Sequence, residues 1–112
     1  MSAVGVEIDD AGFERAVTEA ETPLLVDFWA PWCVPCRALA PRVREFADAN
    51  PGRIAVASVN VEESPETARR HDVLSLPTLI LFRDGRPVER LHGAVSARSL
   101  WRTLTPHLEG TN

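Results

Sequence analysis

Cys33 and Cys36 are the only cysteines of this 112-residue chain, and two residues separate them. They follow a compact apolar run at 24–29 and open a stretch of helical periodicity, so both are expected near the start of a helix. There, unpaired backbone N–H groups and the positive end of the helix dipole favour a thiolate over a thiol. At such sites the pKa of a cysteine can fall from about 8.5 to ~3.5–7.5. The pattern predicts dithiol chemistry, in which Cys33 attacks a disulfide and Cys36 resolves the mixed disulfide.

Two other uses of the cysteine pair stay open at this point. A structural pair is disfavoured because one domain of this size buries enough surface to fold without a disulfide. A structural zinc site needs four ligands, so two histidines would have to join the pair. The three candidates, His71, His92 and His107, are scattered without metal-ligand spacing.

The basic residues are unusual, because all twelve are arginine and the chain contains neither lysine nor tyrosine. This composition excludes lysine Schiff-base chemistry, a P-loop lysine and tyrosine acid–base catalysis. The net charge of −4 and the pI of about 5.3 argue against nucleic-acid binding and against electrostatic binding to a membrane. Arg37, Arg42 and Arg44 are interpreted as a solvent-exposed helix face.

The first fourteen residues contain four acidic residues and no basic one, which is not the pattern of a secretory signal. The apolar stretches are also too short to span a bilayer. We therefore expect a cytoplasmic protein. In that reducing compartment a cysteine pair is more often catalytic or metal-binding than structural.

The periodicity predicts a mixed α/β sheet of five strands flanked by four helices, in one domain spanning 1–112. The expected strands are 4–8, 24–29, 54–61, 78–83 and 87–91, the last two joined by an Asp84-Gly85 hairpin turn. The expected helices follow Asp9 or Asp10, Pro31, Ser64-Pro65 and Ser96 as start signals. Pro106 is expected to shorten the last helix, which would bury Trp101, whereas the three histidines are expected on the surface.

The run VDFWAPWCVPCR at 26–37 resembles the active-site signature of thioredoxins. The similarity continues in order through Leu76-Pro77-Thr78, Phe82-Arg83-Asp84-Gly85 and Gly93-Ala94. It implies a thioredoxin fold and a monomeric protein-disulfide reductase that binds no cofactor. Its Cys33–Cys36 disulfide would receive electrons from NADPH through a thioredoxin reductase, and its substrates would be disulfide-containing proteins.

The resemblance also implies roles for individual residues. Asp27 matches a buried carboxylate that takes the proton of Cys36, and burial without a cation raises the pKa of a carboxylate. Pro77 matches a cis-proline whose loop offers backbone hydrogen bonds to a substrate. The expected apolar rim around an exposed Cys33 sulfur consists of Trp32, Pro35, Leu76, Gly93 and Ala94.

Two departures from the family pattern affect these expectations. Val34 stands where thioredoxins typically have glycine, which leaves the redox potential and the choice of partner open. Ser58 stands where the family often has a lysine near the buried aspartate, so the pKa of Asp27 is expected to rise further. The alternatives are a reductase or oxidant for one dedicated partner and a non-catalytic binding module of the same fold.

Overall fold

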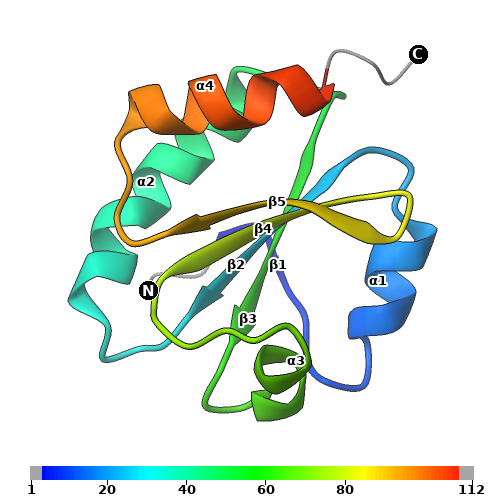
Figure 1. Ribbon diagram of the computed structural model, residues 1–112, viewed down its shortest axis with the longest axis vertical. Helices are drawn as coiled ribbons and strands as arrows, with labels where there is room; N and C mark the ends of the chain where they lie inside the picture. Colours follow the sequence, from blue (N-terminus) through cyan, green and yellow to red (C-terminus); the bar gives the residue numbers. More distant parts are fainter. Residues whose placement is uncertain (1–3, 109–112) are drawn as a thin grey trace.

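The computed structural model describes residues 4–108. Along this range the elements are β1 (Val6–Glu7), α1 (Phe13–Glu19), β2 (Leu24–Trp29), α2 (Val34–Asp48), β3 (Ala55–Asn60), α3 (Pro65–Arg70), β4 (Thr78–Arg83), β5 (Arg86–His92) and α4 (Ala97–Leu108). The strands form one sheet in the order β1-β3-β2-β4-β5 (Figure 1). β1, β3 and β2 are parallel, whereas β4 and β5 are antiparallel to their neighbours. The predicted mixed α/β fold is confirmed.

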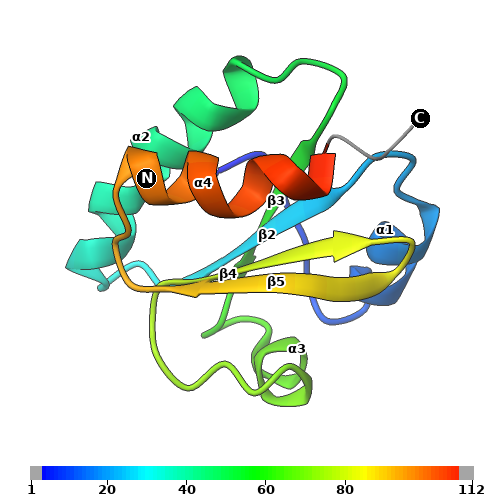
Figure 2. The ribbon, with the colours of Figure 1, turned by 45° about the horizontal axis from the view of Figure 1, so that its top comes forward.

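The sheet separates two apolar cores, because side chains alternate between its faces. Helices α2 and α4 cover one face, and α1 and α3 cover the other (Figures 1 and 2). In the first core Leu25, Leu79 and Leu81 of the sheet meet apolar residues of α2 and α4. In the second core Val26 and Phe28 lie with Phe13 and Val17 of α1. This packing fixes α2, which carries the cysteines, against the sheet.

Strand β2 lies at the centre of the sheet, and all six of its residues are buried. Its uninterrupted apolar run predicts burial on both faces, as in strands covered by helices on each side. Asp27 is the charged residue of this run, and it pairs in register with Ser58 of β3 and Leu79 of β4. The sheet thereby holds a carboxylate between neutral neighbours.

Strand β1 is shorter than predicted. Val4 and Ile8 are buried, but Val6 is 72% exposed, so the three residues do not share one buried face. Gly5 has a φ of +68°, and a Cβ placed there would lie 2.0 Å from the carbonyl oxygen of Val56. The chain approaches β3 closely at Gly5, and this break in the extended backbone interrupts the alternation.

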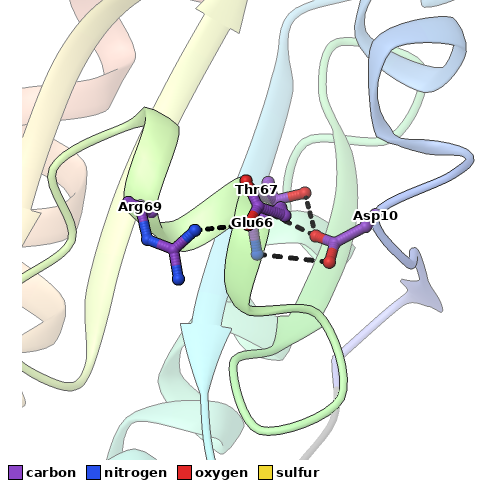
Figure 3. A network of polar contacts seen from close by, with 4 residues as sticks. All are labelled: Asp10, Glu66, Thr67 and Arg69. Atoms are coloured by element: carbon purple, nitrogen blue, oxygen red, sulfur yellow. Dashed lines mark hydrogen bonds and ion pairs between the residues drawn. The ribbon is translucent and has the colours of Figure 1, made fainter.

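Helix α3 is capped from a distance. Ser64 is the N-cap residue, as predicted, but its side chain makes no capping hydrogen bond. The carboxylate of Asp10 accepts instead from the backbone N–H groups of Glu66 (3.2 Å) and Thr67 (2.8 Å) and from the Thr67 hydroxyl (2.7 Å) (Figure 3). Asp10 therefore caps α3 rather than α1, whose N-cap is Gly12.

Helix α4 corrects two predictions. It continues through Pro106 to Leu108, so the proline does not shorten it. Leu100, Leu104 and Leu108 form the buried stripe, whereas Trp101 is 43% exposed and packs edge-on against Phe46. One residue advances a helix by about 100°, so a side chain next to Leu100 leaves the buried stripe.

The histidines are only partly on the surface. His92 is exposed, as predicted, but His71 and His107 are half-buried. The ring of His71 packs against Phe13 and Phe82, with centroid distances of 5.0 and 5.4 Å. The carbon atoms of an imidazole pack on apolar surface while its nitrogens keep polar partners. Here Nδ1 of His71 lies 3.0 Å from the carbonyl oxygen of Thr67.

Candidate active site

The cysteines lie where β2 gives way to α2. Cys33 is the N-cap residue of α2, and its backbone N–H donates to the carbonyl oxygen of Ala30 at 3.1 Å. The Cys33 sulfur accepts from the backbone N–H of Cys36 at 3.2 Å. Pro35 stands in the first turn of the helix, where a missing N–H leaves no helical hydrogen bond unmade. When Cys33 is reduced, a helix N-terminus of this geometry favours its thiolate over its thiol.

Cys33 and Cys36 form a disulfide with their Cα atoms 5.3 Å apart. Cys33 is 4% exposed and Cys36 is 1% exposed, so the first sulfur is far less accessible than the sequence suggests. Trp29 and Ala30 bury the pair, and the half-buried Leu76 packs against the same cluster. Both cysteines are therefore buried, and Cys33 is slightly the more accessible of the two.

The Leu76–Pro77 peptide bond is cis, as the family resemblance implies. The carbonyl oxygen of Pro77 accepts from the backbone N–H of Gly93 at 2.8 Å. On the other side of the bend, the Thr78 hydroxyl donates to the carbonyl oxygen of Ser75 at 2.7 Å. The hydrogen bond between Gly93 and Pro77 joins two segments that about sixteen residues separate, whereas that between Thr78 and Ser75 stays within the bend.

Trp32 is the most exposed aromatic side chain near the cysteines, with 62% of its surface accessible. Pro35 and Ala94 are also exposed. The indole N–H of Trp32 donates to the carboxylate of Glu62, which follows β3. Sequence reasoning missed Glu62. Its position near Trp32 could have been predicted, because the two residues follow β3 and β2, and the carboxyl ends of parallel strands meet at one edge of the sheet.

Asp27 is fully buried, and neither carboxylate oxygen has a hydrogen-bond partner within the described residues. Burial raises the pKa of Asp27 to about 7 from an ordinary value of 3.8, in the direction predicted from the sequence. The hydroxyl of Ser58 and the indole N–H of Trp29 are likewise buried and unpaired among residues 4–108. Asp27, Trp29 and Ser58 belong to the face of the sheet that α2 covers, because they alternate with Val26, Phe28 and Ala57 of the opposite core.

Two arginines of α2 do more than sequence reasoning expected. Arg37 donates to the carbonyl oxygen of Pro31 at 2.9 Å, within the loop that precedes Cys33. Arg42 is half-buried rather than solvent-exposed, and it donates to the carbonyl oxygens of Ala94 (2.9 Å) and Val95 (2.8 Å). Arg44 is exposed, as predicted, and its side chain makes no hydrogen bond to another residue of 4–108.

Within residues 4–108, no group of three or more His, Cys, Asp or Glu side chains is arranged to hold a metal ion. The helices of this part of the chain lack the combined length and apolarity needed to cross a bilayer.

Comparison with known proteins gives a consistent result. The thioredoxin family model matches residues 4–106. Thioredoxin 1 of Nostoc sp. is 44% identical over 108 residues, covering 96% of this chain and all of that protein. The thioredoxin of Alicyclobacillus acidocaldarius is 50% identical over 86 residues, covering 77% of this chain and 81% of that protein. A bifunctional thioredoxin reductase/thioredoxin of Mycobacterium leprae is 40% identical over 111 residues, covering 99% of this chain and 24% of that protein.

Thioredoxins are protein-disulfide oxidoreductases that carry no cofactor of their own and use a redox-active disulfide. The disulfide of this chain lies at the start of a helix, beside a cis-proline and above a sheet that buries an aspartate. Fold, site geometry and the match over residues 4–106 agree. The chain belongs to the thioredoxin family and is a thiol–disulfide oxidoreductase.

Proposed function

We propose that Cys33 is the attacking thiolate and Cys36 the resolving thiol in the reduction of protein disulfides. The observation that carries this assignment is the hydrogen bond from the Cys36 backbone N–H to the Cys33 sulfur at the N-cap of α2. A hydrogen bond to the charged form lowers the pKa of a thiol, and the helix dipole acts in the same direction. Cys36 is the more buried cysteine, which suits a second attack within the protein.

The reaction transfers two electrons in two exchange steps. The Cys33 thiolate attacks one sulfur of the substrate disulfide, a mixed disulfide forms, and the other substrate sulfur leaves as a thiolate that takes up a proton. Cys36 then loses its proton and attacks the Cys33 sulfur. The second substrate thiolate leaves, and the protein keeps the Cys33–Cys36 disulfide.

Asp27 is proposed as the acceptor of the Cys36 proton. A general base works best when its pKa lies near the working pH, and burial raises the pKa of Asp27 to about 7. The carboxylate has no protein partner within the described residues that would compete for the proton. Its strand also faces α2, the helix whose first turn contains Cys36.

We define the substrate platform as Trp32, Pro35, Leu76, Pro77, Gly93 and Ala94. Their positions around the disulfide support a role in binding an extended substrate segment. Apolar surface from Trp32 and Pro35 would bury substrate side chains, and backbone groups of the cis-proline loop would pair with the substrate main chain. Such a platform binds many sequences weakly, because backbone groups carry no sequence information.

The electrons are proposed to come from NADPH through a thioredoxin reductase. The Mycobacterium leprae relative supports this, because its name joins a thioredoxin reductase to a thioredoxin in one protein. The proposal includes disulfide-containing proteins as substrates and a monomeric, single-domain protein of residues 1–112 acting in the cytoplasm.

An insulin-reduction assay with dithiothreitol as the electron source tests the assignment without a reductase. Cys33→Ser is expected to reduce insulin no faster than dithiothreitol alone does. Cys36→Ser, reduced and then freed of dithiothreitol before insulin is added, is expected to accumulate a mixed disulfide between Cys33 and insulin, visible by mass spectrometry. A mixed disulfide on Cys36 in the Cys33→Ser variant, with none in the Cys36→Ser variant, would reverse the order of attack. A measured reduction potential separates a reductant from an oxidant.

A further inference from the structure

Arg42 joins helix α2 to the connection between β5 and α4. One guanidinium nitrogen, Nη1, donates to two consecutive carbonyl oxygens, those of Ala94 (2.9 Å) and Val95 (2.8 Å). These acceptors lie 52 and 53 residues further along the chain. Figures 1 and 2 both show the β5–α4 connection beside α2. Hydrogen bonds from a charged donor are stronger than neutral ones, so this contact restrains the connection.

The connection has two further hydrogen bonds that lead to the cis-proline. The backbone N–H of Val95 donates to the carbonyl oxygen of Gly93 at 2.8 Å, and the N–H of Gly93 donates to the carbonyl oxygen of Pro77 at 2.8 Å. Gly93 has a φ of +81°, a conformation that glycine adopts without strain. A continuous series of contacts therefore runs from Arg42 through residues 93–95 to Pro77.

The series connects the two halves of the substrate platform. Trp32 and Pro35 belong to the loop and first turn that lead into α2, whereas Pro77, Gly93 and Ala94 belong to loops of the sheet. A substrate segment that spans both halves binds well only if they are already at the right separation. Arg42 can fix that separation, because it lies on α2, which carries the cysteines, and donates to the carbonyl oxygens of Ala94 and Val95 in the loop of the other half.

We propose that Arg42 is a positioning residue that keeps the Gly93–Ala94 side of the platform in register with the cysteines, and so favours protein disulfides over small ones. The proposal rests on the proposed function of this platform. Arg42 touches neither sulfur. Its role is to hold the loop at 93–95 in place before a protein substrate binds, so that binding does not have to order the loop. A small disulfide needs only the Cys33 sulfur and gains little from the platform.

The experiment compares Arg42→Met with Arg44→Met. Methionine keeps much of the apolar stem and removes the donors, and both variants lose the same charge. Arg44 is the matched control because it lies on the same helix, is exposed, and its side chain makes no hydrogen bond to another residue of 4–108. Each protein is reduced, freed of reductant and mixed with insulin or with hydroxyethyl disulfide, and the second-order rate constants are measured by timed alkylation of thiols.

Arg42→Met is expected to lower the rate constant for insulin about fivefold, and to change that for hydroxyethyl disulfide by less than about twofold. Arg44→Met is expected to leave both within about twofold of the parent. The proposal is overturned if Arg42→Met slows both substrates equally, if it leaves the insulin rate unchanged, or if Arg44→Met has the same effect.

Amide hydrogen exchange at Gly93 reports the structural link directly. Loss of the Arg42 contacts is expected to speed exchange of the Gly93 N–H, which bonds Pro77, while amides in β2 keep their protection. Unchanged exchange at Gly93 would overturn the proposal. Failure of the proposed function gives a different result, because the unmodified protein would then fail to reduce insulin, or Cys33→Ser would remain active.

Discussion

Asp27 and Asp10 are carboxylates of the same type in opposite surroundings. Asp27 is buried in the centre of the sheet, its carboxylate has no hydrogen-bond partner among residues 4–108, and burial raises its pKa to about 7. Asp10 lies at the start of α3, where Thr67 and Glu66 donate three hydrogen bonds to it (Figure 3). Partial desolvation would raise the pKa of Asp10, but these hydrogen bonds and the charge of Arg70 outweigh it and lower the pKa.

The difference shows that an aspartate side chain can have a structural or a chemical role, depending on the groups around it. Donors around Asp10 favour its ionised form, and the ionised form in turn caps a helix. Asp27 has no donors that would favour ionisation, so its charge opposes folding near neutral pH. A group that is unfavourable when charged is also one that readily accepts a proton.

The largest expected effect is on the free energy of unfolding, which the buried charge of Asp27 lowers. Below pH 3.8 the side chain is neutral whether the protein is folded or not; above about pH 7 it is ionised in both states, and only the folded state disfavours the charge. A pKa difference of about three units corresponds to about 4 kcal/mol. Asp27→Asn is therefore expected to raise the free energy of unfolding at pH 8, measured with urea.

The same variant should gain little at pH 4, where the parent side chain is mostly neutral when folded. Stability that changes equally at pH 4 and pH 8 would show that burial of the charge is not the cause. Ser58→Ala serves as the control for altering a buried polar side chain of the same region.

The next effect is kinetic. Asp27→Asn is expected to slow the attack of Cys36 on the mixed disulfide by about 10- to 100-fold at pH 7, because the proton acceptor is lost. Rapid mixing of reduced protein with a disulfide peptide separates this step from the first attack by Cys33. The first attack is the internal control and is expected to keep its rate. Equal slowing of both steps would contradict the role of Asp27 as a base for Cys36.

A smaller effect tests the neutral surroundings of Asp27. Ser58→Lys places a cation at the position that pairs with Asp27 across β2 and β3, and it is expected to lower the pKa of Asp27 by about one unit or more. An NMR pH titration of the Asp27 carboxyl carbon in the reduced protein measures this. Ser58→Ala is the neutral control. A value at or below about 3.9 in the parent protein would contradict the effect of burial itself.

The smallest effect concerns Asp10. Its lowered pKa means that its contribution to stability is present above pH 3.8 and is lost as the pH falls through the folded pKa. Asp10→Ala is expected to lower the melting temperature at pH 7, with a smaller difference at pH 2.5. Asp48→Ala is the control, because Asp48 is exposed and its carboxylate makes no hydrogen bond to another residue of 4–108. A pH-independent difference would indicate lost packing instead of a lost charged cap.

Much of the site could be predicted from local pattern. The apolar run of β2 followed by Cys33 and Cys36 predicts a dithiol at a strand–helix junction, and both the junction and the disulfide are present. The Asp84-Gly85 pair predicts a hairpin turn, and both residues have positive φ, as the tight turn requires. These features depend on residues that are neighbours in the chain, so periodicity and turn chemistry were sufficient.

Other features were wrong or missing because they depend on distant segments. Trp101 was predicted in the core, but the packing of α4 placed its stripe of leucines there instead. Arg42 was predicted in solvent, yet its partners lie beyond β5. The cis geometry at Pro77 came from the family resemblance, since only ~5–6% of X–Pro bonds in folded proteins are cis.

The sequence by itself determined the chemistry of this protein. It has two cysteines at a helix start, a carboxylate within an apolar strand, and no lysine that could pair with that carboxylate. Tertiary structure decided what surrounds each group. The Asp10 carboxylate caps a helix whose residue Glu66 lies 56 positions further along the chain, whereas the Asp27 carboxylate has no partner in the described residues. The fold also joins Pro77 to Gly93. The physical reason is that thiol chemistry and strand burial follow from neighbours in the chain, whereas pKa and register follow from contacts that only the folded sheet creates.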